Sequence, residues 1–171
     1  VVTGWESEGL TVVYFHPGAA YVHRSWPSVV VGSTRKAEDA VFVDLNRDSN
    51  ADVVTSCEQH MEKVLVNWAP AEKERLLVPQ AWRQEEFPAA TGVSQWMFAE
   101  PIALNGPDQP LSLVIGGKNY EHKQTATLGL LLPGADPARA ADYRWQPLTN
   151  VSWVMSIITL DMNGDQQPDI L

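Results

Sequence analysis

Two stretches of the sequence carry closely spaced side chains whose oxygen atoms could bind a metal ion. The same spacing recurs in both, and the two sets are Asp44, Asn46, Asp48 and Asp52, and Asp161, Asn163, Asp165 and Asp169. Asp or Asn at positions 1, 3, 5 and 9 of a tight loop brings oxygens towards one point, and hard cations such as calcium need six to eight of them. The repetition at one register therefore predicts two calcium sites.

The remaining ligands and the competing interpretations follow from the flanks of these loops. We expect a backbone carbonyl near position 7, from Asn50 or Gln167, and water to complete each shell. An EF-hand is excluded because position 6 is not glycine, position 12 of the first copy is Thr55, and the flanks are short and β-branched. An Asp/Asn-rich turn without metal is the other alternative, but its three carboxylates would repel one another.

Composition limits the classes of protein to which the chain can belong. With 171 residues, 44% of them hydrophobic, it can bury a substantial core in one domain. A net charge of −9 argues against a nucleic-acid partner, and no apolar run is long enough for a transmembrane helix. The single cysteine, Cys57, excludes an internal disulfide and is expected to be a packed thiol. Because the chain starts at Val1, we expect it to be a processed or excised piece.

A third loop is expected midway between the first two, near residue 102. The stretch from Ile102 to Pro110 lies there and is followed by an apolar run from Leu113. Its first position is Ala103, its fifth is Pro107, and its ninth is Leu111 or Ser112, depending on a one-residue insertion. This loop has the position of the others but few of their ligands, so we expect no tightly held calcium in it.

Two further landmarks recur with each loop. An apolar strand ends in a proline at Pro17, Pro70 and Pro133, and a tryptophan then precedes or opens another strand at Trp26, Trp82 and Trp145. Four strands in a unit of about 52 to 60 residues are typical of a propeller blade. We therefore expect an all-β fold, a β-propeller of four-stranded antiparallel blades, with about three blade-equivalents. Their approximate limits are 1–36 (partial), 37–94, 95–151 and 152–171 (partial).

The acidic loops and the strands around them resemble the FG-GAP/VCBS repeats, the calcium-bearing β-propellers related to the integrin head. The resemblance spans essentially the whole chain, and its most specific part is Asp-x-Asn-x-Asp-x-x-x-Asp followed by two aliphatic residues. It implies that the loop joins the innermost strand of a blade to the next strand. The middle repeat departs from this pattern. Because three blades cannot close a ring, the resemblance implies further blades in the same or another chain.

A ligand site is the second functional candidate. Trp96 and Trp153 precede innermost strands, and Glu38 and Asp39 occupy the corresponding stretch of the first full blade. Such segments lie near the central channel, where propellers often bind ligands. Packing of the two indoles and a solvated acidic pair are the alternative. Trp26, Trp82 and Trp145 recur in register, which favours a packing role.

Two functions compete on this basis. The first is a calcium-stabilised, non-enzymatic binding or scaffold module with a protein or glycan ligand. Its expected location is extracellular, at the cell surface or periplasmic, where calcium is millimolar. The second is a polysaccharide-binding or polysaccharide-processing propeller of the lyase or hydrolase type, with its site at the central channel. The second needs paired carboxylates, and only Glu38 and Asp39 are evident from the sequence.

Overall fold

The computed structural model describes residues 1–106, 108–119 and 125–171, which form β-strands and short 3-10 helices without an α-helix. The strands are β1 (Val2–Trp5), β2 (Leu10–Tyr14), β3 (Ser28–Ser33), β4 (Ala37–Val43), β5 (Asp52–Cys57), β6 (Lys63–Trp68), β7 (Arg83–Glu86), β8 (Gln95–Ile102), β9 (Ser112–Lys118), β10 (Ala126–Leu132), β11 (Arg144–Val151), β12 (Thr159–Leu160) and β13 (Asp169–Ile170). The 3-10 helices are η1 (Ala19–Tyr21), η2 (Gln59–Met61), η3 (Lys73–Arg75), η4 (Pro79–Ala81), η5 (Pro88–Ala90) and η6 (Ala140–Asp142). No helix in this part of the chain is long and apolar enough to cross a membrane.

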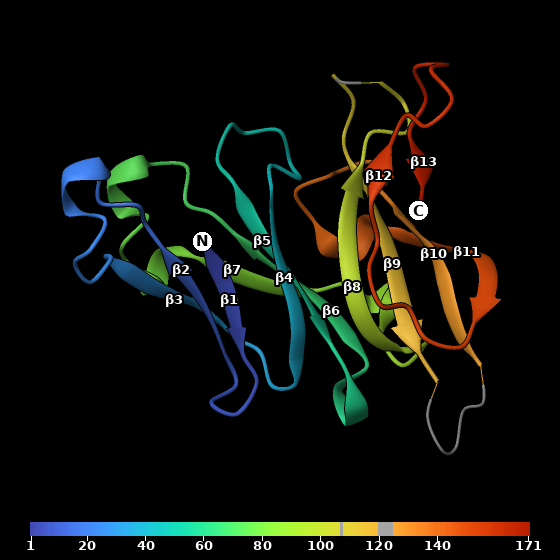
Figure 1. The fold of residues 1–171 in the computed structure, drawn as a ribbon, viewed down its shortest axis with the longest axis horizontal. Helices are drawn as coiled ribbons and strands as arrows, with labels where there is room; N and C mark the ends of the chain where they lie inside the picture. Colours follow the sequence, from blue (N-terminus) through green and yellow to red (C-terminus); the bar gives the residue numbers. More distant parts are fainter. Residues whose placement is uncertain (107, 120–124) are drawn as a thin grey trace.

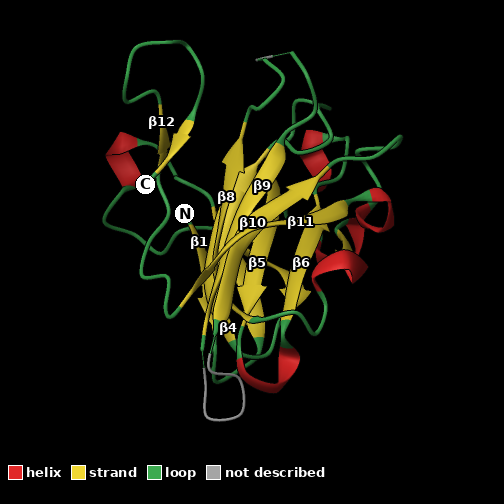
Figure 2. Ribbon diagram, turned by 90° about the vertical axis from the view of Figure 1, so that its right-hand side faces the viewer, coloured by secondary structure: helices red, strands yellow, loops and turns green. Residues whose placement is uncertain are grey.

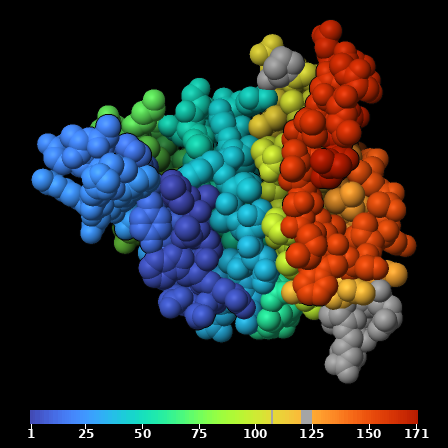
Figure 3. Space-filling model, viewed as in Figure 1, coloured from blue at the N-terminus to red at the C-terminus, as the bar shows by residue number. Residues whose placement is uncertain are grey.

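The strands form four antiparallel sheets that follow one another along the chain (Figure 1). Their strand orders are β1-β2-β3, β4-β5-β6-β7, β8-β9-β10-β11 and β12-β13. The expected all-β class and the four-stranded antiparallel sheets are thus confirmed. Figure 3 shows the sheets side by side in sequence order, from the blue first sheet to the red last one. Each sheet therefore packs mainly on its neighbours in the sequence.

Apolar side chains fill the space between successive sheets. The largest core lies between the second and third sheets and includes Val54, Phe87, Trp96 and Ile115. Two smaller cores join the first sheet to the second and the third sheet to β12 and β13. The central strand β5 is buried along its whole length, because it is covered on both faces. Three of its six residues are apolar, and the polar Asp52, Thr55 and Ser56 are buried with them.

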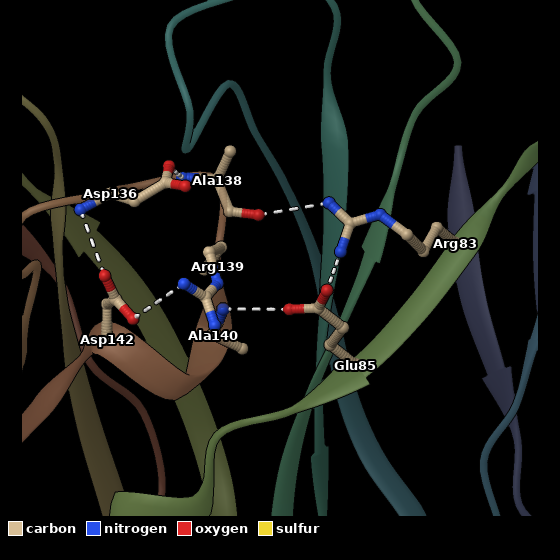
Figure 4. Close-up of polar contacts among 7 residues, drawn as sticks. All are labelled: Arg83, Glu85, Asp136, Ala138, Arg139, Ala140 and Asp142. Atoms are coloured by element: carbon tan, nitrogen blue, oxygen red, sulfur yellow. Dashed lines mark hydrogen bonds and ion pairs between the residues drawn. The ribbon is translucent and has the colours of Figure 1, made fainter.

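A set of polar contacts, here called the polar bracket, joins the second and third sheets at their outer side, between β7 and η6 (Figure 4). Arg83 forms an ion pair with Glu85 and donates a hydrogen bond to the carbonyl of Ala138 (3.0 Å). Glu85 in turn accepts a hydrogen bond from the amide of Ala140 (2.9 Å). The bracket therefore fixes the segment before β11 against β7.

All three acidic-type loops project from the same end of the sheets, the upper end in Figures 1 and 2. Each joins two antiparallel strands, and the residue pairs that close the loops are Val43–Asp52, Ile102–Ser112 and Leu160–Asp169. The expectation left Leu111 or Ser112 as the ninth position of the middle loop. The strand pairing assigns it to Ser112.

Candidate metal loops and an opposing charged cluster

The first loop is held by hydrogen bonds from its own backbone to its acidic side chains. The two carboxylate oxygens of Asp44 accept hydrogen bonds from the amides of Asp48 and Ser49, each at 3.0 Å. Asn46 Oδ1 accepts from the amide of Asp48 (3.1 Å), and Asp48 Oδ1 accepts from the amide of Asn50 (2.8 Å). Positions 1, 3 and 5 are thereby turned towards the inside of the loop.

The second loop repeats this arrangement bond for bond. Asp161 accepts from the amides of Asp165 (3.1 Å) and Gln166 (2.9 Å). Asn163 Oδ1 accepts from the amide of Asp165 (2.9 Å), and Asp165 Oδ1 accepts from the amide of Gln167 (2.8 Å). The backbone amides that donate to Asp161, with that of Gln166 foremost, lower the pKa of its carboxyl. Two segments far apart in the sequence thus adopt one local geometry.

The backbone of the two loops also matches in its unusual conformations. Position 4 is left-handed in both, with φ of 62° at Arg47 and 79° at Gly164. Position 6 is left-handed as well, with φ of 69° at Ser49 and 67° at Gln166. L-residues other than glycine rarely adopt this region, so the side-chain hydrogen bonds hold three of these residues in it.

Position 7 offers its backbone rather than its side chain in the first loop. The Asn50 side chain is buried, and its Nδ2 donates to the carbonyl of Ala71 (3.2 Å), outside the loop. Because the side chain is bound outside the loop, the main-chain carbonyl is the oxygen that we expect Asn50 to give to a cation. The corresponding Gln167 is exposed.

The ninth position closes the first loop onto the sheet. Asp52 is completely buried, and its two oxygens accept hydrogen bonds from the amides of Leu45 (3.1 Å) and Ala69 (2.8 Å). Burial raises the pKa of Asp52 to about 7, and repulsion by Asp48 and Asp44 adds to the rise. A divalent cation among these three carboxylates would remove that repulsion, so the donor set fits calcium.

The three aspartates of either loop are less tightly grouped than another acidic set. Within the described part of the chain, three acidic ligand atoms lie within 4.8 Å of one another only at Glu6, Glu38 and Glu58. In the first loop the ninth residue, Asp52, is turned towards its two amide donors. Asp169 likewise accepts from the amide of Met162 (2.9 Å).

The middle loop lacks the ninth aspartate and also one of the amide donors that go with it. Ser112 replaces the ninth aspartate and is buried, and its Oγ has no hydrogen-bond partner among the described residues. The residue that follows the third strand of this sheet is Pro133, where the second sheet has Ala69. Proline has no amide hydrogen, so the carboxylate and its donor are absent together. Pro107, at the fifth position, lies outside the described residues.

The group of three glutamates lies at the opposite end of the strands from the loops. Glu6 and Glu58 follow β1 and β5, and Glu38 is the second residue of β4. Lys118, at the end of β9, forms an ion pair with Oε2 of the buried Glu58, while Lys36 pairs with Glu6 (2.9 Å). Within the residues that the structure describes, Oε2 of Glu58 has no other hydrogen-bond partner. Two ammonium groups thus neutralise much of this cluster, which argues against a divalent cation there.

Glu38 and Glu58 are linked by a side-chain hydrogen bond and titrate in opposite directions. Burial, followed by repulsion from Glu58, raises the pKa of Glu38. Burial also acts to raise the pKa of Glu58, but hydrogen bonds from Lys118 and Gln59 outweigh it, and the net shift is downward. Of the two, Glu38 is therefore the more easily protonated. We call Glu6, Lys36, Glu38, Glu58 and Lys118 the charged cluster.

The structure places the four candidate ligand-binding residues in different environments. Trp96 is completely buried, and its indole donates to the carbonyl of Ala90 (2.9 Å). Trp153 is 53% exposed and lies over the ammonium of Lys118, 5.0 Å from the ring centroid. Glu38 is exposed within the charged cluster. Glu38 thus belongs to the charged cluster, Trp153 borders it through Lys118, and Trp96 belongs to the core.

Asp39 has a partner that the sequence did not reveal. Its carboxylate accepts a hydrogen bond from the amide of Ala99 in β8, and burial raises its pKa. Glu100, the next residue of β8, also has a pKa raised by burial and by the charge of Asp39. β4 and β8 are in contact although they belong to different sheets. Two carboxylates with raised pKa values therefore lie on adjoining strands.

The recurring tryptophans lie between sheets or under loops. Trp82 is buried in the core between the first and second sheets, and its indole donates to Leu76. Trp145 is half-buried and packs edge-on against Trp96, with ring centroids 5.3 Å apart. Trp26 is half-buried and packs edge-on against His16. Their surroundings agree with the packing role that their register suggested.

Comparison of the chain with protein-family models, with curated proteins and with solved structures finds no significant match.

Proposed function

We propose that the chain is a calcium-stabilised, β-propeller-type module of an exported protein. On this proposal it acts outside the cell, at the cell surface or in the periplasm as a binding or scaffold surface. The observation that carries the proposal is that the two acidic loops have the same local geometry. Segments with the same acidic spacing make the same hydrogen bonds and adopt the same two left-handed positions. The resemblance to the FG-GAP/VCBS repeats agrees with this proposal.

Calcium would be held by side-chain oxygens at positions 1, 3, 5 and 9 and by the carbonyl at position 7. It would supply positive charge near three carboxylates that repel one another, as the effect of Asp48 and Asp44 on the pKa of Asp52 indicates. Because each loop joins two strands of one sheet, the cation would stabilise the pairing of those two strands. The Asp and Asn oxygens are hydrogen-bonded to the backbone, which preorganises them for a structural site.

The proposal is tested by titrating calcium into the metal-free chain and by following thermal unfolding. A site saturated at 100 times its Kd stabilises the folded protein by ~2.7 kcal/mol. Wild type should bind two calcium ions, and Asp48→Asn or Asp165→Asn should each lose one. Asp108→Asn is the matched control, because Asp108 is exposed in the middle loop. The absence of both calcium binding and a shift in melting temperature would refute the proposal.

A second function rests on the acidic pair of β4 and β8. A polysaccharide-binding or polysaccharide-processing site needs converging carboxylates, and Asp39 and Glu100 satisfy part of that requirement. A glycan array combined with a lyase and hydrolase screen tests it. Turnover that is abolished by Asp39→Asn and by Glu100→Gln supports an enzyme. Binding without turnover supports a recognition module. If neither turnover nor binding is detected, this second function is refuted.

A further inference from the structure

Arg47 occupies a position at which the other two loops use glycine. It is the fourth residue of the first loop, with φ of 62°, and its counterparts are Gly106 (φ 99°) and Gly164 (φ 79°). Glycine adopts this left-handed region without steric cost, whereas an L-side chain does not. An arginine at this position therefore retains a strained backbone that two related loops avoid.

The side chain of Arg47 leaves its own loop and reaches the middle one. Its Nε and Nη2 both donate to the carbonyl oxygen of Gln109, at 3.3 Å and 3.1 Å. Arg47 contributes nothing to the calcium ligands of the first loop, because its guanidinium is a donor only. The strained residue thus serves the neighbouring loop.

Gln109 is the seventh residue of the middle loop counted from Ala103, and the sixth counted back from the ninth position, Ser112, because this loop has one residue more than the others. Position 7 is where the two acidic loops are expected to present a backbone carbonyl to calcium. In the middle loop, where the first ligand is Ala103 and the ninth is Ser112, this carbonyl instead faces a guanidinium. A positive charge provided by the protein therefore lies beside a backbone carbonyl in the same part of the loop.

We propose that the Arg47 guanidinium takes the place of a bound cation in the middle loop and so couples that loop to the first one. Arg47 is flanked by Asn46 and Asp48, two of the expected ligands, so a cation that fixes the first loop also fixes the guanidinium. This last step rests on the proposed function, whereas the direct effect of Arg47 on the middle loop does not.

Hydrogen–deuterium exchange of the whole chain tests the proposal through peptides that cover residues 108–112. Two variants remove the contact. Arg47→Gly also permits the left-handed backbone, and Arg47→Ala keeps its steric cost. Arg35→Ala is the matched control, because Arg35 is an exposed arginine for which no ion pair or hydrogen bond is found in the described structure. In chelator, both Arg47 variants should accelerate exchange of these peptides roughly tenfold, as expected for loss of a hydrogen bond to a charged group.

Repeating the exchange experiment with calcium separates the role of Arg47 from the proposed calcium-binding function. In wild type, calcium should slow exchange in residues 44–52 and also in 108–112, whereas in Arg47→Gly it should slow only 44–52. Unchanged exchange of 108–112 in both Arg47 variants in chelator would overturn the role of Arg47. If calcium slows no peptide, the proposed function fails, and the chelator arm still decides the role of Arg47.

Discussion

Replacement of Asp52 by alanine should destabilise the metal-free protein more than the same replacement of Asp169. Asp52 is buried and is the acceptor for two amides, those of Leu45 and Ala69. Asp169 is half-buried and is the acceptor for one amide, that of Met162. Because both residues occupy the ninth position of their loops, the comparison isolates the effect of burial and of the second donor.

The magnitude follows from the donors that lose their acceptor. A buried amide without a partner costs about 1–3 kcal/mol, so two of them cost about 2–6 kcal/mol. Part of this cost is offset because the ionised Asp52 carboxylate is itself unfavourable where it is buried. We expect a net loss of about 2–3 kcal/mol for Asp52→Ala and of about 1 kcal/mol or less for Asp169→Ala.

Urea unfolding in excess chelator, followed by tryptophan fluorescence and circular dichroism, measures both values without calcium. The chain has seven tryptophans, which give the fluorescence signal. A loss for Asp52→Ala no larger than that for Asp169→Ala would show that the two buried hydrogen bonds do not stabilise the fold as argued. In that case the local geometry of the first loop would not depend on its attachment to β6.

The remaining predictions concern the charged groups and the thiol. Lys118→Met leaves the nearly buried Glu58 without its ion-pair partner, and it should lower the free energy of unfolding by about 3 kcal/mol in chemical denaturation. Lys73→Met is the control at an exposed position and should change the free energy of unfolding little. The folded-state pKa of Glu100 is raised above its ordinary value, chiefly by burial. Its stabilising contribution is therefore complete below the unfolded-state value and is lost as pH rises through the folded-state value. Glu100→Gln, which mimics the neutral acid, should gain stability relative to wild type over that rise, and a pH-independent difference would contradict the shift. Burial raises the pKa of Cys57 to about 12, so a thiol reagent at pH 8 should label it only at the rate of unfolding, and fast labelling of the native chain would contradict this.

The repeat could be predicted from the sequence because it depends only on the spacing of residues that are close together along the chain. The two acidic loops, the eroded loop near residue 102 and the all-β character all follow from residue types at fixed intervals. Strand pairing was also accessible, since Asp52 and Asp169 each start the strand after their loop, as Ser112 does in the middle. The one-residue insertion in the middle loop left the register open by one position, and only the pairing with Ile102 resolved it.

The contacts between sheets could not be read in this way. Glu100 lies in an apolar strand and becomes noticeable only because β8 adjoins β4 and brings it near Asp39. Glu58 and Lys118 occupy one register position in successive sheets, but their pairing depends on how those sheets pack. Trp96 resembles Trp153 in sequence position, yet one is core and the other is exposed. Local periodicity does not contain the relative placement of sheets.

Partial neutralisation of the charged cluster narrows the search for a ligand. Lys36 and Lys118 already pair with Glu6 and Glu58, so a cationic ligand would have to displace a lysine there. Asp39 and Glu100 differ, since neither takes part in an ion pair within the described residues, and each repels the other's charge. An ammonium group placed between them would relieve that repulsion, and an ammonium or a sugar hydroxyl would donate hydrogen bonds to the two carboxylates in a half-buried setting. Ligand screens that report on β4 and β8 therefore test this acidic pair directly.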